Sequence, residues 1–156
     1  MNVLAIDPGN KESAYVYFNG AVDEAGKCPN ETLLGMIEDS VHCDHMAIEM
    51  VQSFGMAVGA EVFETVYWIG RFCQASPVPV TRVFRSDVKM HLCQSMRAKD
   101  GNIRQALIDR FGPPGKKKAP GATYGLSGDM WSALAVAVTF TDKFQKSAEC
   151  HREGSK

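Results

Sequence analysis

The sequence contains no apolar run near the roughly 20 residues that a membrane-spanning helix needs. Its first ten residues hold no basic leader and reach an acid at Asp7, so we expect neither secretion nor membrane insertion. The five cysteines are odd in number, scattered and without a CxxC pair, which argues against a disulfide framework and a zinc ribbon. We therefore expect a cytoplasmic protein.

The chain also lacks internal repeats and an extreme composition. With 45% hydrophobic and 22% charged residues it is typical of a globular protein, which excludes wholesale disorder and a fibrous repeat. At 156 residues, two domains would each be too short to bury much core. We predict one domain over residues 1–143, followed by a polar tail at 144–156.

A net charge of -1 hides an uneven distribution along the chain. Residues 1–70 hold 11 acidic and 2 basic residues, whereas residues 71–118 hold 3 acidic and 11 basic residues. The basic segment is suited to binding phosphate, and the acidic segment can supply metal-binding carboxylates. Ordinary solvated faces that balance one another explain the counts equally well.

The hydrophobic pattern predicts an α/β fold with a five-stranded mixed sheet flanked by helices. Asn19-Gly20 indicates a hairpin in an antiparallel meander of the first three strands, and the helical crossovers that follow favour parallel pairing of the last two. The helix at 54–72 is apolar nearly all round, so it needs cover on two sides, either from its own core or from a second subunit. The strands are expected at 2–7, 13–18, 21–22, 45–51 and 78–84, the helices at 31–40, 54–72, 87–96, 102–111 and 129–142, and a loop at 112–128.

Three acids occupy unusual positions in this pattern. Asp7 ends the apolar run LAID, and Glu49 lies inside the apolar run AIEM. If the two strands are neighbours, about 4.8 Å apart, the carboxylates repel each other unless they share a cation. Asp129 begins the last helix, where a first-turn acid is also favoured by the helix dipole alone.

These residues resemble the motifs of the RuvC family of Holliday-junction resolvases, in the RNase H-like, or retroviral integrase, superfamily. The first motif is Leu4-Ala5-Ile6-Asp7-Pro8-Gly9, the second is Ala47-Ile48-Glu49-Met50-Val51, and the last is Asp129 followed by Ser132-Ala133-Leu134-Ala135-Val136-Ala137. The agreement in element order runs from residue 1 to about 142 and implies an RNase H-like fold. Small members of the family occur in bacteria, phages and organelles, so a phage-encoded protein would act in the host cytoplasm.

The resemblance implies a homodimeric endonuclease that resolves Holliday junctions and other branched DNA by paired nicking. Asp7, Glu49 and Asp129 would be the catalytic metal ligands, holding Mg²⁺ with Mn²⁺ as a substitute, and two ions in each active site. Magnesium prefers oxygen ligands, and two ions about 4 Å apart can activate a water and stabilise the leaving oxygen of a phosphodiester.

The sequence departs from the family at Ser132. The family places a second acidic or histidine residue three positions after the first, one helical turn away on the same face. A neutral serine hydroxyl is a poor magnesium ligand, so Ser132 is a weak candidate for the fourth position. The alternative function is a junction-binding protein with weak or no cleavage.

Basic residues of the net-positive segment are candidates for binding DNA phosphates. Phe54, just beyond the second motif, is a candidate wedge between bases by resemblance, although core packing explains it as well. The basic candidates are Arg82, Arg85, Lys89, Arg97, Lys99, Arg104, Lys116, Lys117 and Lys118.

Two further short motifs have less support as functional sites. The turn Asp7-Pro8-Gly9 also opens actin-like ATPases, but no second glycine-rich phosphate loop follows it. The run His42-Cys43-Asp44-His45 contains zinc-binding residue types, but their spacing matches no common structural zinc site.

Overall fold

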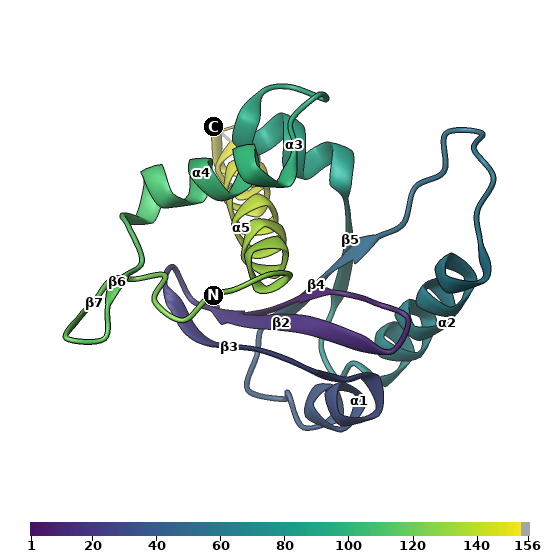
Figure 1. Cartoon of the computed structure of the whole chain (residues 1–156). Helices are drawn as coiled ribbons and strands as arrows, with labels where there is room; N and C mark the ends of the chain where they lie inside the picture. The colour runs from purple at the N-terminus through teal and green to yellow at the C-terminus, as the bar shows by residue number, and fades with distance from the viewer. Residues whose placement is uncertain (154–156) are drawn as a thin grey trace.

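The computed structural model describes residues 1–153, with side chains described up to residue 147. One five-stranded sheet lies between helices on its two faces (Figure 1). The elements in chain order are β1 (Val3–Asp7), β2 (Glu12–Phe18), β3 (Val22–Pro29), α1 (Asn30–Glu38), β4 (His45–Met50), α2 (Ala60–Ala75), β5 (Val80–Phe84), α3 (Arg85–Cys93), α4 (Asp100–Phe111), β6 (Gly115–Lys116), β7 (Ala119–Pro120) and α5 (Met130–Glu153).

The strand order is β3-β2-β1-β4-β5. The first three strands pair antiparallel, and β4 pairs parallel with both β1 and β5. This confirms the predicted five-stranded mixed sheet, the meander and the two parallel crossovers. Strand β1 is therefore central, which places the strand that ends in Asp7 beside the strand that holds Glu49.

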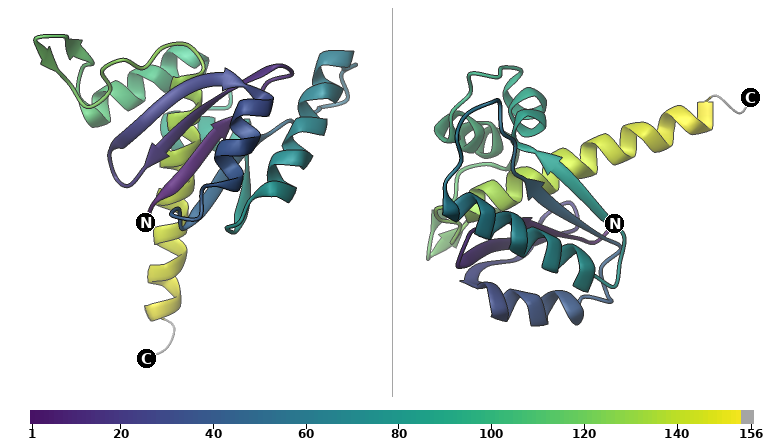
Figure 2. Two further views of the ribbon diagram at one scale, coloured as in Figure 1. Left: turned by 90° about the horizontal axis from the view of Figure 1, so that it is seen from below. Right: turned by 90° about the vertical axis from the view of Figure 1, so that its right-hand side faces the viewer.

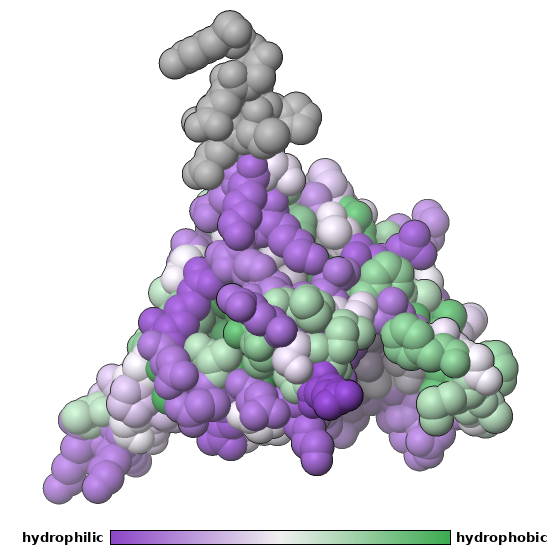
Figure 3. Space-filling model, turned by 90° about the horizontal axis from the view of Figure 1, so that it is seen from above, coloured by the Kyte–Doolittle hydropathy of each residue, from purple (hydrophilic) through white to green (hydrophobic). Residues whose placement is uncertain are grey.

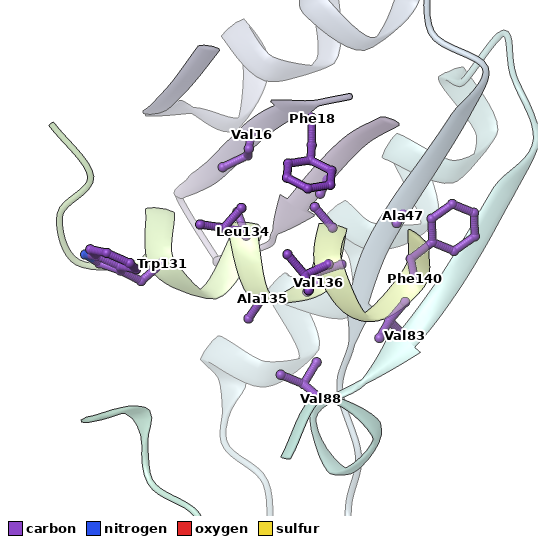
Figure 4. Close-up of a cluster of buried hydrophobic side chains, with 14 of the residues drawn as sticks. Val16, Phe18, Ala47, Val83, Val88, Trp131, Leu134, Ala135, Val136 and Phe140 are labelled. Atoms are coloured by element: carbon purple, nitrogen blue, oxygen red, sulfur yellow. The ribbon is translucent and has the colours of Figure 1, made fainter. Parts of the chain in front are cut away.

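Strand β1 is buried on both faces because it is covered by helices on both sides. Its residues Val3 and Ala5 belong to the core under α5, while Leu4 and Ile6 belong to the core under α1 and α2. In the first core, side chains of the sheet such as Val16 and Ala47 meet the apolar run of α5 (Figure 4). The ends of this central strand and of α5 are thus fixed relative to each other.

Three elements differ from their predicted ranges. The strand expected at 21–22 runs from Val22 to Pro29 as the edge strand β3. The helix expected from residue 54 begins at Ala60, because Gly55 adopts a φ of 78°, in the left-handed region that a helix does not contain. The predicted loop 112–128 includes the short β6–β7 hairpin.

The last helix is longer than predicted. The apolar pattern ends near residue 142, but α5 continues to Glu153 and extends beyond the sheet (Figure 2). Its second half is held to the body by ion pairs, including Lys143 Nζ to Asp87 Oδ1 at 3.1 Å. The division into a domain of residues 1–143 and a tail stays a prediction, and residues 154–156 of that tail lie outside the described residues.

Within the described part of the chain, no helix has both the length and the apolar character to cross a membrane. Cys28, Cys43, Cys73 and Cys93 are free thiols, as expected from their scattered positions, and the side chain of Cys150 lies outside the described residues.

Candidate active site

The sheet brings Asp7 and Glu49 together at the carboxyl ends of β1 and β4. The parallel register pairs Ala5 with Ala47 and Ile6 with Ile48, so the next position on each strand is an acid. Side chains alternate along a strand, and Ala5 and Ala47 face the core under α5. Asp7 and Glu49 therefore face the same side, toward the N-terminal end of α5.

A buried hydrogen-bond network fixes the turn that follows Asp7. The Ser13 hydroxyl donates to Asn30 Oδ1 at 2.6 Å, and Asn30 Nδ2 donates to the Gly9 carbonyl at 2.9 Å. The Gly9 amide donates to Ser13 Oγ at 3.1 Å, which closes the network. A side chain at Gly9 would collide with the Glu12 carbonyl oxygen, so only glycine fits there. The network orients the end of β1 and hence the Asp7 carboxylate.

The third acid, Asp129, precedes the first turn of α5. Its Oδ2 accepts a hydrogen bond from Lys27 Nζ of β3 at 2.7 Å. Helix α5 packs on the sheet through Leu134 and Val136, which are fully buried, and this packing fixes the height of its N-terminal end above the strands. The core thus holds Asp129 close enough to Asp7 for its charge to act on that carboxyl.

Arg85 and Asp100 complete the charged cluster. Arg85 is the first residue of α3, and its Nη1 donates to Glu49 Oε2 at 3.3 Å. Its Nη2 donates to Oδ1 of Asp100, the first residue of α4. One guanidinium therefore joins an acid of the sheet to an acid of a flanking helix.

The neighbouring charges act on the two acids of the sheet, Asp7 and Glu49. Burial, together with the carboxylates of Glu49 and Asp129, raises the pKa of Asp7 to about 7. Burial also raises the pKa of Glu49, while the neighbouring Arg85 opposes the shift. Asp100 adds to the rise of both pKa values. Such a concentration of negative charge is stabilised by a cation.

Ser132 lies where the sequence places it, one turn beyond Asp129. Together with Asp100 and Arg85 these two residues line a cleft of about 300 Å³ between α4 and the start of α5. The acids that line this cleft are Asp129 and Asp100, and Asp7 and Glu49 are not among its lining residues. Position 132 itself offers a hydroxyl and no carboxylate.

The donor set fits a magnesium ion in its chemistry, since it offers carboxylate and hydroxyl oxygens without sulfur or imidazole. Among the residues that the structure describes, however, no three His, Cys, Asp or Glu side chains are gathered as a ready metal site. Two of the three acids instead form ion pairs, Asp129 with Lys27 and Glu49 with Arg85. The assignment of Asp7, Glu49 and Asp129 as metal ligands stays a prediction.

The basic candidates lie in four places, and only some of them are near the cleft. Arg85, Lys89 and Arg104 lie at or beside it: Lys89 lowers the pKa of Glu49, and the Arg104 guanidinium stacks 4.9 Å from the ring of Trp131. Arg97 and Lys99 are exposed on the segment between α3 and α4. Arg82, in contrast, lines a separate groove between β5 and the second half of α5.

The lysine run projects away from the cleft. Lys116, Lys117 and Lys118 lie on the exposed β6–β7 hairpin, which extends from one corner of the molecule (Figures 1 and 3). Phe54 lies apart from this run in the sequence and is 73% exposed. It is in the loop 51–59 before α2 and not at a helix start as expected, so core packing does not explain it.

The run from His42 to His45 forms no common site. The His42 ring packs on Tyr17, Cys43 is buried in the core under α1 and α2, and Asp44 accepts from the amide of Asn2. His45 stacks on a phenylalanine of α5. The four side chains have separate partners, so the zinc interpretation has no support here.

Sequence reasoning missed Lys27 and Asp100 and gave Arg85 a different role. Lys27 lies on a polar edge strand and is 102 residues from its partner Asp129 in the chain. Asp100 follows the turn between two helices, where an acid is ordinary as a helix-start residue. One feature could have indicated that Arg85 and Asp100 are close together. They are the first residues of the consecutive helices α3 and α4.

Neither a protein-family model nor a curated protein sequence matches this chain. Several solved structures do match it. RuvC of Thermus thermophilus has 22% identity and a TM-score of 0.62 over 94% of this chain and 97% of that one. T. thermophilus RuvC in complex with a Holliday junction substrate has 18% identity and a TM-score of 0.61, over 89% and 92% of the two chains.

The yeast mitochondrial Holliday junction resolvase Ydc2 is also similar, with 10% identity and a TM-score of 0.60 over 88% of this chain and 77% of that one. At these identities the likeness establishes the fold. The class is the RNase H-like fold, as the sequence predicted. Within that class the chain is a structural neighbour of RuvC and Ydc2 over most of its length.

Proposed function

We propose that this protein is a structure-selective endonuclease that resolves Holliday junctions and other branched DNA by metal-dependent paired nicking. The observation that carries the proposal is the pairing of Asp7 with Glu49 at the ends of neighbouring strands, with Asp129 close enough to act on Asp7, in a fold similar to that of RuvC. One neighbour with this fold is a RuvC complex with a Holliday junction substrate. The free thiols fit action in a reducing cytoplasm.

In this proposal Asp7, Glu49 and Asp129 would hold Mg²⁺ or Mn²⁺, two ions in each site. When bound, the ions would supply an activated water and stabilise the leaving oxygen. The protein residues provide the anionic oxygens, and the cleft admits the DNA backbone. Arg104, exposed at the cleft and stacked on Trp131, is placed to contact a phosphate.

We also propose that the active form is a homodimer, because a symmetric junction cut on two opposed strands needs two active sites related by a two-fold axis. Helix α2 and the loop 51–59 supply a surface for it. Met56, Phe63 and Tyr67 are each more than half exposed there, and apolar residues gather at this corner of the molecule (Figure 3). Large exposed apolar patches are typical of protein interfaces.

A junction-binding protein with weak or no cleavage is the second candidate, favoured by Ser132. The two candidates separate in one experiment: purified protein is incubated with a labelled four-way junction and with a linear duplex, in Mg²⁺ or in chelator. Paired nicks in the junction that require Mg²⁺ support the endonuclease. Binding without nicks in either condition, with intact protein, contradicts it and supports the second candidate.

A further inference from the structure

Arg85 is the largest charged side chain inside the acidic cluster, and its two partners differ in their surroundings. The side chains of Arg85 and Glu49 are only 24% and 18% exposed, whereas that of Asp100 is 85% exposed. The guanidinium thus bridges a partly buried acid of the site and an acid on its rim. A guanidinium can satisfy two carboxylates at once because its donors form a rigid fork.

The bridge places a positive charge on an acid that the proposed metal also needs. An arginine hydrogen-bonded to Glu49 occupies an oxygen of that carboxylate and repels a nearby divalent cation. Asp100, the second partner, allows Arg85 to give up Glu49 to a metal and still keep an ion pair. If the guanidinium moves off Glu49, it keeps its ion pair with Asp100, and that end is in contact with water.

We propose that Arg85 is a displaceable counter-cation of the active site. It neutralises Glu49 in the metal-free protein and retreats to Asp100 when a divalent cation binds, so Asp100 is a positioning residue that acts through Arg85. The inference rests on the proposed metal-dependent function and adds to it a built-in competition between a side chain and the metal.

The experiment measures Mn²⁺ binding by titration calorimetry, with thermal unfolding in chelator and in Mg²⁺ as a second readout. Arg85→Gln is expected to bind Mn²⁺ more tightly than wild type, by on the order of tenfold. Its melting temperature is expected to fall in chelator and to recover in Mg²⁺. Arg110→Gln is the matched control, because Arg110 forms a comparable pair with Asp142 away from the cleft and should leave Mn²⁺ affinity unchanged.

Asp100→Asn tests the retreat. In the wild-type background it should weaken Mn²⁺ binding, because Arg85 loses its second partner and stays on Glu49. In the Arg85→Gln background the same change should have a much smaller effect, and this double-mutant cycle isolates the coupling. An equal loss of affinity in both backgrounds would mean that Asp100 acts on the metal directly, which overturns the inference.

The other outcomes are also decisive. If Arg85→Gln does not fold, Arg85→Lys keeps one charge without the fork, and a rise in affinity of about threefold is expected instead. If a folded Arg85 variant binds Mn²⁺ as tightly as wild type or more weakly, Arg85 has a fixed structural role and the inference is wrong. The proposed endonuclease function is not affected by that result. If neither wild type nor variant binds Mn²⁺, both the inference and the metal-dependent function fail.

Discussion

Asp7 carries the most costly charge in the site, because burial and two neighbouring carboxylates all oppose its ionisation. Its carboxyl keeps its proton to a higher pH in the folded than in the unfolded chain. Without a metal, folding stability therefore falls as the pH rises from about 4 toward the raised pKa of about 7. A residue held at such a cost is expected to serve the chemistry and not the fold.

Asp7→Asn should lower the cleavage rate about a hundredfold or more, because metal-ion catalysis supplies several kcal/mol of transition-state stabilisation. Binding to a four-way junction should persist. In chelator at pH 8 the variant should be more stable than wild type by about 1–3 kcal/mol, since the unfavourable charge is gone. Nicking assays and urea unfolding measure these effects, with the exposed Asp23→Asn as control; full cleavage by Asp7→Asn would refute the metal assignment.

Ser132→Asp should lower the Mg²⁺ concentration for half-maximal cleavage, because an anionic oxygen then faces the cleft that Asp129 lines. In chelator the added charge should crowd the other acids and lower the melting temperature, and Mg²⁺ should reverse the loss. A magnesium titration of cleavage and melting follows both effects. Superimposed curves for variant and wild type would remove Ser132 from the site.

At the scale of single residues, the sequence was enough to single out acids that lie among apolar neighbours. Asp7 and Glu49 could be found because a carboxylate inside an apolar strand is costly to bury unless a cation or a hydrogen-bond partner meets it there. Lys27 and Asp100 could not, because each lies in a polar segment, where charge is ordinary. Their role depends on contacts across the fold, such as that of Lys27 with Asp129.

At the scale of elements, the β6–β7 hairpin is the clearest candidate for sequence-independent DNA binding. Replacing Lys116, Lys117 and Lys118 by alanine should weaken binding to all DNA shapes, because lysines near phosphates release counterions from DNA. The slope of log affinity against log salt should become shallower by up to about 0.9 for each lost contact. Binding is measured from low to high salt, with the exposed Lys146→Ala as control, and an unchanged slope would mean that the hairpin is only solvated.

Helix α5 is held to the helical layer by a second charged cluster. Asp142 accepts two hydrogen bonds from Arg110 of α4, at 2.6 and 3.0 Å, and one contact of 2.7 Å joins it to His91 of α3. The hydrogen bonds from Arg110, and then the one contact with His91, hold the pKa of Asp142 below its ordinary value, although burial opposes this. Its stabilising effect is present above the unfolded-state pKa near 4 and is lost as the pH falls through the lowered folded-state pKa.

Asp142→Asn should therefore cost about 1–3 kcal/mol of unfolding free energy at pH 7, because charge-assisted hydrogen bonds are lost. The difference between variant and wild type should shrink as the solution is made more acidic than pH 4. Urea unfolding at several pH values gives the measurement. A difference that stays constant down to pH 2 would show that the loss comes from packing and not from the charge.

Element types were predictable wherever the apolar pattern was strong, as in β1, β4 and the first half of α5. Their ends were not. Strand β3 has the polar sequence around Asp23 and Glu24, and it forms because β2 offers backbone partners and Tyr15 packs against Gly26. The extension of α5 depends on ion pairs with α3 and α4 and on the contact of His45 with Phe144, which no local pattern contains.

At the scale of the whole molecule, charge and apolar surface are divided between different regions. Several basic candidates lie at the cleft or on the hairpin, while half of the large exposed apolar residues lie on α2 and the loop before it (Figure 3). A groove between α1 and α2, lined by Leu34, Val66 and Tyr67, continues this apolar surface. A second copy docked on α2 would leave the cleft and the hairpin of each subunit free for DNA.

Replacing Phe63 and Tyr67 by glutamate tests this arrangement. The two residues are 66% and 59% exposed, so the change should cost the monomer little stability, but it places charges in the core of the proposed interface. Light scattering should give half the mass of the wild-type dimer. Cleavage of a four-way junction should shift from paired nicks to single, uncoupled nicks, because the two active sites are no longer joined.

The matched control is Val41→Glu, an equally drastic change at a residue that is 73% exposed outside the α2 surface. It should leave both the mass and the pairing of nicks unchanged. If the wild-type protein is monomeric at micromolar concentration yet makes paired nicks, the dimer forms only on the DNA. Light scattering of the complex with a four-way junction would then show two copies of the protein. If the double variant still makes paired nicks and keeps the wild-type mass on the junction, the α2 surface is not the interface, because two buried glutamates at its centre would have to remain without partners.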